Sequence, residues 1–142
     1  MTNRRLQLLR VTLLACAAYY LVGTLAHFFG LTIFPWYDRQ LYAPYHDTLL
    51  ALCGAAFVLI FLAIAKDPIK NADMIKVIIA SFTITIFFNL YIIWKIDFTA
   101  LGSSIKKLQT IFETALAILA IIALLALKPK NANPNPHIAK VE

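Results

Sequence analysis

A few polar residues lie within or beside long apolar stretches and supply the groups with which this chain could do chemistry. Glu113 and Asn89 lie inside apolar runs, and His27, His46 and Lys95 lie near the ends of such runs. An acid, an amide, two imidazoles and an amine can hydrogen-bond a ligand, hold an ion or move protons. Glu113 is the most informative, since an ionisable group inside a membrane segment usually faces a cavity or a partner.

Each of these groups has two interpretations. Glu113 and Asn89 could hydrogen-bond each other and lock two helices together, or Glu113 could anchor a ligand, an ion or a proton. His27 and His46 could ligate a haem or a metal or relay protons, or they could only form interfacial hydrogen bonds. They have no third ligand and no cysteine cluster beside them, so the sequence predicts neither a metal site nor a cofactor.

Four apolar segments must position these groups: Val11–Phe29, Thr48–Ala65, Ile75–Trp94 and Leu108–Leu127. The chain has 142 residues, of which 61% are hydrophobic and 14% charged, which is too apolar for a small soluble domain. Each segment is about long enough to cross a bilayer as a helix, and none alternates like a barrel strand. The sequence therefore predicts an all-α polytopic membrane protein, a single four-helix transmembrane bundle over residues 1–142 with a polar tail over 128–142.

The basic residues predict which way the spans point. Nine of the 13 Lys and Arg residues flank the spans on the side of the two termini, and the other four, Arg39, Lys95, Lys106 and Lys107, flank the opposite side. Because Lys and Arg accumulate in cytoplasmic loops, both termini are expected in the cytoplasm. The net charge of +6 then meets anionic lipid headgroups, and nucleic acid is not expected as a partner because the basic residues bracket apolar spans.

Helical spacing places the polar residues on one face of each span. Tyr20 and His27 share a face of the first span, and Thr85 and Asn89 share a face of the third. Stripes of small and polar residues hold helices together in lipid, so each stripe is expected to face the bundle interior. Glu113 and Asn89 lie roughly 8 Å below the outer interface, which predicts an outward-facing polar layer above an apolar inner half.

The longest outer connection, Gly30–Asp47, is rich in aromatic residues and carries Trp36, Tyr37, Asp38 and Arg39. Trp and Tyr prefer the headgroup region, so this loop could be an interfacial belt. Long loops in compact proteins are also often lids, so it could instead cover a site that opens outward.

Four short segments form a pattern along the first part of the chain: Arg4-Arg5, the aromatic run Phe34-Pro35-Trp36-Tyr37, Tyr45-His46-Asp47 at the start of the second span, and Ala65-Lys66-Asp67-Pro68 at its end. This pattern resembles small four-span bacterial membrane proteins of the BphX-like and DoxX-like families. The resemblance covers roughly the first three spans and leaves out the fourth. It implies a small multi-pass protein of the bacterial inner membrane, in families whose biochemical role is mostly undefined.

Two classes of function fit these features. The first is a non-enzymatic accessory or binding protein that docks on protein partners or on a second copy, or that holds a small amphiphile in the polar layer. The alternative is a membrane enzyme or redox subunit that acts on a lipophilic substrate through His27, His46 and Glu113. The sequence has no nucleophile elbow, phosphate-binding loop, dinucleotide fingerprint or CxxC motif, which favours the first class.

Overall fold

The fold consists of four long helices. The computed structural model describes residues 2–34, 37–100 and 104–129, and contains α1 (Asn3–Phe29), α2 (Pro44–Lys66), α3 (Ala72–Lys95) and α4 (Ser104–Leu127). A short 3-10 helix, η1 (Arg39–Leu41), precedes α2. Apart from one isolated bridge between Ile33 and Tyr37, every regular element in the described residues is helical. Most of the predicted polar tail, residues 130–142, lies outside the described part of the chain.

All four helices are long and apolar enough to cross a membrane, so the prediction of an all-α chain with four such helices is confirmed. The placement of both termini in the cytoplasm stays a prediction. The helices also extend beyond the apolar segments into their polar flanks. For example, α1 begins at Asn3 because the Thr2 hydroxyl accepts a hydrogen bond from the Arg5 backbone N–H, 3.4 Å away.

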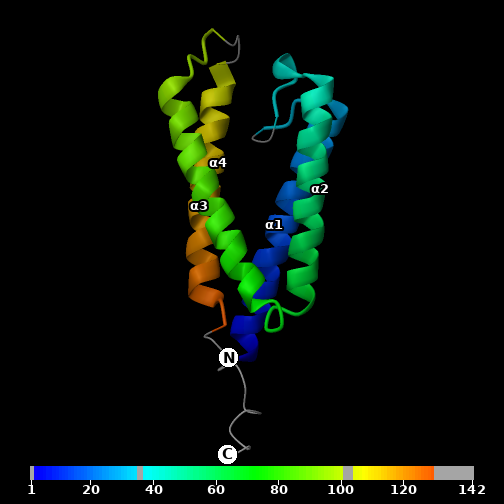
Figure 1. Cartoon of the computed structure of the whole chain (residues 1–142), viewed down its shortest axis with the longest axis vertical. Coiled ribbons are helices and arrows are strands. Elements are labelled where there is room, and N and C mark those ends of the chain that lie inside the picture. The colour runs from blue at the N-terminus through cyan, green and yellow to red at the C-terminus, as the bar shows by residue number, and fades with distance from the viewer. Residues whose placement is uncertain (1, 35–36, 101–103, 130–142) are drawn as a thin grey trace, which may run out of the picture.

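The helices form two pairs that meet at one end (Figure 1). α1 packs along α2 and α3 packs along α4, whereas α2 and α3 have few contacts with each other. The pairs converge beside the N-terminus and the α2–α3 turn, and they separate toward the opposite end of the molecule. The bundle is therefore V-shaped, with a narrow end and a wide end.

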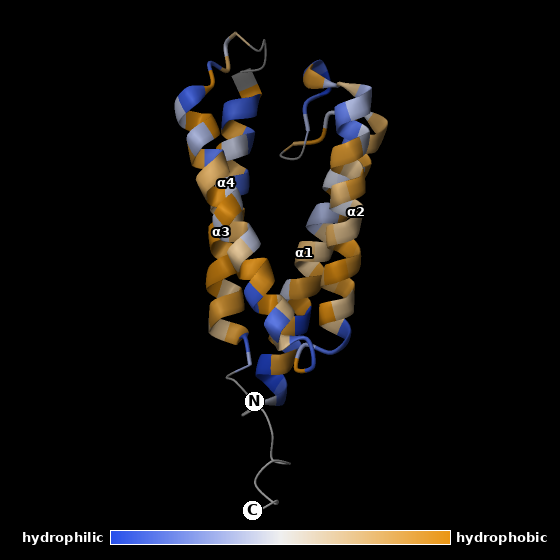
Figure 2. Cartoon of the chain, in the orientation of Figure 1, coloured by the Kyte–Doolittle hydropathy of each residue, from blue (hydrophilic) through white to orange (hydrophobic). Residues whose placement is uncertain are grey.

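The buried core lies at the narrow end and is apolar. Leu9 and Leu13 of α1, Phe61 of α2, Ile75 of α3 and Leu124 of α4 are all fully buried there. By contrast, large apolar side chains are exposed along the outer faces of the helices, and Figure 2 shows that polar residues concentrate at the helix ends. This distribution fits helices whose outer faces contact lipid.

Basic side chains at the narrow end bind the carbonyl ends of two helices. An Arg5 guanidinium nitrogen donates to the carbonyl of Ala126 near the end of α4, and Arg10 donates to the carbonyl of Lys66, 3.5 Å away, at the end of α2. Cations are favourable at helix C-termini, where the last carbonyls have no partner within the helix. The narrow end is thus held by both apolar packing and charge.

The closest approach of α1 to α2 depends on a glycine. A Cβ atom at Gly54 would lie 2.4 Å from the hydroxyl oxygen of Thr24, and Thr24 is itself fixed because its hydroxyl donates to the Tyr20 carbonyl at 2.7 Å. A branched side chain held in this way has little freedom to move aside. Gly54 therefore sets the spacing of the α1–α2 pair.

We expect Gly54→Ala to lower the free energy of unfolding by about 1–3 kcal/mol, because the new methyl group overpacks this contact. Thr24→Ala removes the obstructing oxygen, so the double variant should recover most of the loss. Denaturant unfolding of the four proteins of this cycle in a mild detergent measures the effect. Equal destabilisation by Gly54→Ala in both backgrounds would contradict the assignment.

Candidate functional site

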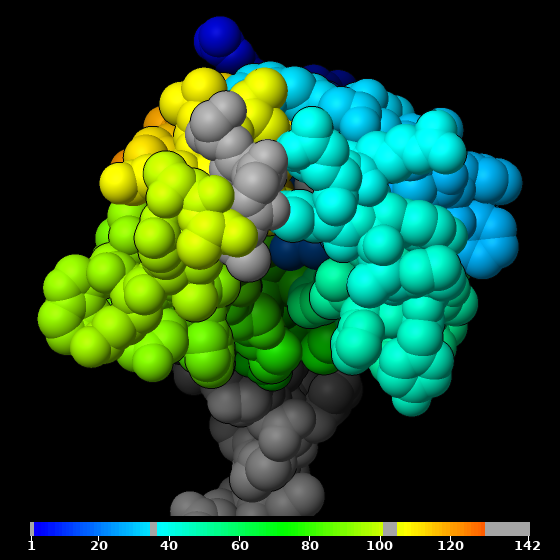
Figure 3. Space-filling model, turned by 90° about the horizontal axis from the view of Figure 1, so that it is seen from above, coloured from blue at the N-terminus to red at the C-terminus, as the bar shows by residue number. Residues whose placement is uncertain are grey.

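A cavity of about 680 Å³ lies between the two helix pairs and is lined by all four helices. Figure 3, which looks down on the wide end, shows the hollow between the pairs. Small-molecule sites usually occupy roughly 300–1,000 Å³ and are mostly apolar with a few polar groups. The size of this cavity falls within that range.

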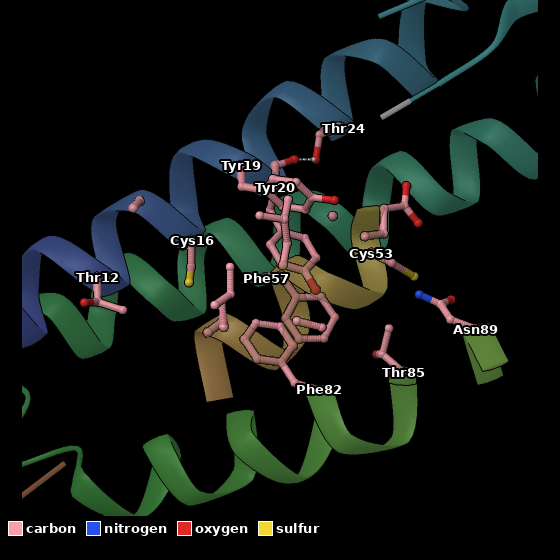
Figure 4. Close-up of a pocket in the computed structure, with 18 of the residues that line it drawn as sticks. Thr12, Cys16, Tyr19, Tyr20, Thr24, Cys53, Phe57, Phe82, Thr85 and Asn89 are labelled. Atoms are coloured by element: carbon pink, nitrogen blue, oxygen red, sulfur yellow. Dashed lines mark hydrogen bonds between the residues drawn. The ribbon is translucent and has the colours of Figure 1, made fainter. Parts of the chain in front are cut away.

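An aromatic cluster lies where the core meets the cavity. Tyr20 of α1 stacks on Phe57 of α2, with ring centroids 5.0 Å apart, and lies nearly parallel to Phe82 of α3 at 6.4 Å. All three rings line the cavity (Figure 4). Phe82 belongs to the buried core, and Tyr20 and Phe57 pack against it. This cluster, defined by Tyr20, Phe57 and Phe82, connects the core to the cavity, whose lining continues toward the narrow end as far as Val11 and Thr12 of α1.

Polar side chains from all four helices line the rest of the cavity. They include Tyr19, Thr24, His27, Cys53, Thr85, Asn89 and Glu113. In Figure 4 the amide of Asn89 points from α3 toward Cys53 of α2, across the space between the pairs. The predicted polar layer thus has a counterpart in the wall of a cavity.

Asn89 has the most telling environment of these residues. The residue is only 9% exposed, and its Nδ2 atom has no hydrogen-bond partner among the described residues. A buried donor without a partner costs about 1–3 kcal/mol, so such atoms call for an explanation. Because Nδ2 is unpaired, the hydrogen bond from Asn89 to Glu113 that would lock α3 to α4 is not formed. No other hydrogen bond or ion pair of Glu113 is found among the described residues.

The structure divides the predicted site residues into two sets. Tyr20, His27, Asn89 and Glu113 line the cavity, whereas His46 and Lys95 do not. His46 is exposed beside Tyr45, and the amine of Lys95 lies over the ring of Trp94, 4.1 Å from its centroid. The cavity lining therefore does not unite the two histidines. Within the described residues, no group of three or more His, Cys, Asp or Glu side chains could hold a metal ion.

The predicted lid loop folds on itself at the wide end. Tyr37 and Asp38 are buried and Arg39 is exposed, while Trp36 lies outside the described residues. The Arg39 backbone N–H donates to the Thr32 hydroxyl at 3.0 Å. Across the V, the ring of Phe34 contacts the ring of Phe112 on α4, with centroids 5.8 Å apart. The loop thus joins the α1–α2 pair to α4 near the wide end.

Asp47 organises this region, whereas the sequence indicated it only as part of the segment Tyr45-His46-Asp47 that carries the family resemblance. Its carboxylate is buried and accepts hydrogen bonds from the Tyr37 hydroxyl at 2.9 Å and from the Ala43 backbone N–H at 2.6 Å. It also contacts Nδ1 of His27 at 2.7 Å. An acidic residue in the first turn after Pro44 was the available signal, since such residues often bind the free N–H groups of a helix start.

The contacts of Asp47 favour one position of the proton on each of two neighbouring side chains, Tyr37 and His27. Burial, together with the hydrogen bond to Asp47, raises the pKa of the Tyr37 phenol above its ordinary value, so Tyr37 remains a neutral donor at neutral pH. A carboxylate at Nδ1 of His27 favours the tautomer with its proton on that nitrogen. Nε2 of His27 is then left as a hydrogen-bond acceptor, and His27 lines the cavity.

We expect Asp47→Ala to lower the free energy of unfolding by about 2–3 kcal/mol, because it leaves buried partners of a charged group unpaired. The loop should also become more susceptible to trypsin at Arg39. Asp73→Ala is the matched control, since Asp73 lies in the first turn of α3 and only forms an exposed ion pair with Lys76. Equal effects of the two variants on stability and cleavage would rule out the organising role of Asp47.

Comparison of the chain with protein-family models, with curated proteins and with solved structures finds no match in any of the three. The resemblance to the BphX-like and DoxX-like families therefore stays a prediction that depends on short segments. What the protein does has to be inferred from the cavity between its helix pairs and from the groups that line it.

Proposed function

We propose that this protein is a non-enzymatic binding or accessory protein that holds a small amphiphilic molecule in the cavity between its two helix pairs. The apolar part of the ligand would contact the aromatic cluster, and its polar head would contact the groups around Asn89 and Glu113. Docking on a protein partner or on a second copy would be a further role of the same bundle.

The observation that carries this proposal is the unpaired donor of Asn89. A buried, unpaired N–H group in a cavity of ligand size is a cost to the free protein. A bound molecule that carries an oxygen acceptor would remove this cost. A polar group such as the Asn89 donor orients the ligand and gives specificity in a site whose remaining surface is largely apolar.

The surroundings support an amphiphile rather than a water-soluble ligand. The cavity combines the rings of Tyr20, Phe57 and Phe82 with hydroxyl, amide and carboxyl groups. It is also bounded by helices long enough to cross a membrane, so a ligand could enter from lipid. We place the protein as a multi-pass protein of the bacterial inner membrane with both termini in the cytoplasm. The basic flanks and the family resemblance favour this placement.

A membrane enzyme or redox subunit is the second candidate, and the Asp47–His27 contact favours it. A carboxylate that orients an imidazole beside a cavity is a common arrangement for a general base. His46, the other histidine this function would use, is exposed and is not part of the lining. The binding function therefore accounts for more of the site.

Filling the cavity provides the first test. Thr85 and Thr83 both lie on α3 and both donate to the carbonyl four residues earlier, but only Thr85 lines the cavity. We expect Thr85→Phe to lower the affinity for a neutral single-chain amphiphile, 1-monolauroylglycerol, by about tenfold or more, equivalent to about 1.4 kcal/mol. Thr83→Phe should bind like the wild type.

Native mass spectrometry of the protein released from detergent micelles measures the fraction that carries this amphiphile. Equal binding by the wild type and both variants would show that the probe sits elsewhere, and would count against the cavity as its site. Unfolding midpoints of the two variants control for differences in folding.

The second test uses the opposite effects expected for binding and stability. Asn89→Leu removes the unpaired donor, so it should raise the free energy of unfolding of the ligand-free protein by about 1 kcal/mol. The same variant should bind 1-monolauroylglycerol about fivefold to tenfold more weakly, because the hydrogen bond to the ligand is worth roughly that much. Chemical unfolding and native mass spectrometry measure the two effects. A destabilised variant with unchanged binding would mean that Asn89 is a structural residue.

A further inference from the structure

We infer that the polar head of the ligand is cationic: a lipophilic amine or quaternary ammonium compound that also carries an oxygen acceptor. This inference rests on the proposed binding function and narrows it to one chemical class. It depends on the charge of the cavity lining, on the aromatic cluster and on the donor of Asn89.

The charge of the lining is one-sided. Among the described residues that line the cavity there is a carboxylate, Glu113, but no Lys or Arg. Lys106 lies on the same face of α4, but seven residues earlier, which is about 10 Å along the helix axis, and it is not part of the lining. The nearby charge of Asp47 is already in contact with His27. Glu113 is therefore the one carboxylate of the described lining, and no cationic side chain of the lining pairs with it.

A carboxylate in this position selects the charge of an occupant. Ionised groups inside a membrane protein are costly unless a partner neutralises them. A cationic head group would supply that partner, whereas an anionic head would be repelled at short range. A neutral head group would supply no opposite charge.

The aromatic cluster favours the same class of ligand. Cations are attracted to the faces of aromatic rings, and sites that recognise quaternary ammonium groups are commonly built from several such rings. Tyr20, Phe57 and Phe82 line the cavity together with Tyr19. Glu113 lines the same cavity as these rings. A cation between Glu113 and these aromatic rings would neutralise the carboxylate and would also contact the faces of the rings.

Asn89 adds a requirement for an acceptor on the ligand. Its unpaired Nδ2 donor cannot bind a cation directly, but it can donate to an ester, ether or carbonyl oxygen. The ligand class is thus an alkyl chain joined through an oxygen-bearing linker to an ammonium group. Lauroylcholine has this composition and serves as the probe.

The experiment compares lauroylcholine with 3,3-dimethylbutyl laurate, in which a neutral carbon replaces the ammonium nitrogen and little else changes. We expect the wild type to bind lauroylcholine at least tenfold more tightly than the neutral ester in native mass spectrometry. Glu113→Gln should abolish this preference by weakening lauroylcholine alone, and Glu113→Asp should keep part of it.

Asp97→Asn is the matched control for charge. Asp97 is fully exposed just beyond the end of α3, so this variant removes one negative charge from the same end of the molecule without touching the cavity. It should leave the preference for lauroylcholine unchanged. An equal loss of preference in Asp97→Asn and Glu113→Gln would overturn the inference in favour of general surface attraction.

The outcomes separate this inference from the proposed function. If the wild type binds both probes equally and Thr85→Phe weakens both, the cavity binds amphiphiles but the cationic class is wrong. If neither probe binds the wild type, both proposals fail. If Glu113→Gln does not fold, the comparison of the two probes on the wild type still tests the inference. A ratio of the two affinities near one refutes it.

Discussion

The meeting of the two helix pairs in one apolar core at the narrow end is the constraint on which the rest of the structure depends. Leu13, Phe61 and Ile75 are fully buried there, and Arg5 and Arg10 bind helix C-termini at the same end. Because the pairs diverge above this core, the polar faces of α1 and α2 cannot close against those of α3 and α4. The cavity is a direct consequence of this divergence.

The wide end is organised by a different interaction. The buried carboxylate of Asp47 binds the loop through Tyr37 and Ala43 and binds α1 through His27. The same loop reaches α4 through the contact of Phe34 with Phe112. This hydrogen-bonded cluster and the ring contact together hold the loop at the edge of the cavity. This explains how an open V-shaped bundle can still present a defined site.

Much of the fold follows from sequence periodicity and apolar length. The spans and the shared faces of Tyr20 with His27 and of Thr85 with Asn89 could be predicted, because helical geometry fixes which residues point the same way. The sequence could not predict how far along each helix the residues of that face line the cavity. His46 lies one turn before Leu50, the first residue of α2 in the lining. Lys95 lies beyond Asn89, the last residue of α3 in the lining. These limits depend on the angle between the pairs.

The same reason explains why the unpaired donor of Asn89 and the role of Asp47 were not predicted. A sequence shows that two polar groups can meet, as Asn89 and Glu113 could, but the separation of the helices decides whether they do. Asp47 carried a helix-start signal, yet its partners Tyr37 and His27 come from a loop and a helix whose paths are set by tertiary packing. The site thus depends more on how the helices and the loop are arranged than on any sequence motif.

The most direct test of the central claim observes the Asn89 side-chain amide while an amphiphile binds. In ¹⁵N-asparagine-labelled protein, NMR resolves the side-chain amides, and Asn71, which donates to the Asp67 carbonyl at 2.9 Å in the α2–α3 turn, is an internal reference. On titration with 1-monolauroylglycerol, the amide protons of Asn89 should shift downfield and exchange more slowly with water, while those of Asn71 stay unchanged. An Asn89 signal that does not respond at saturating amphiphile would contradict the claim that this cavity is the binding site.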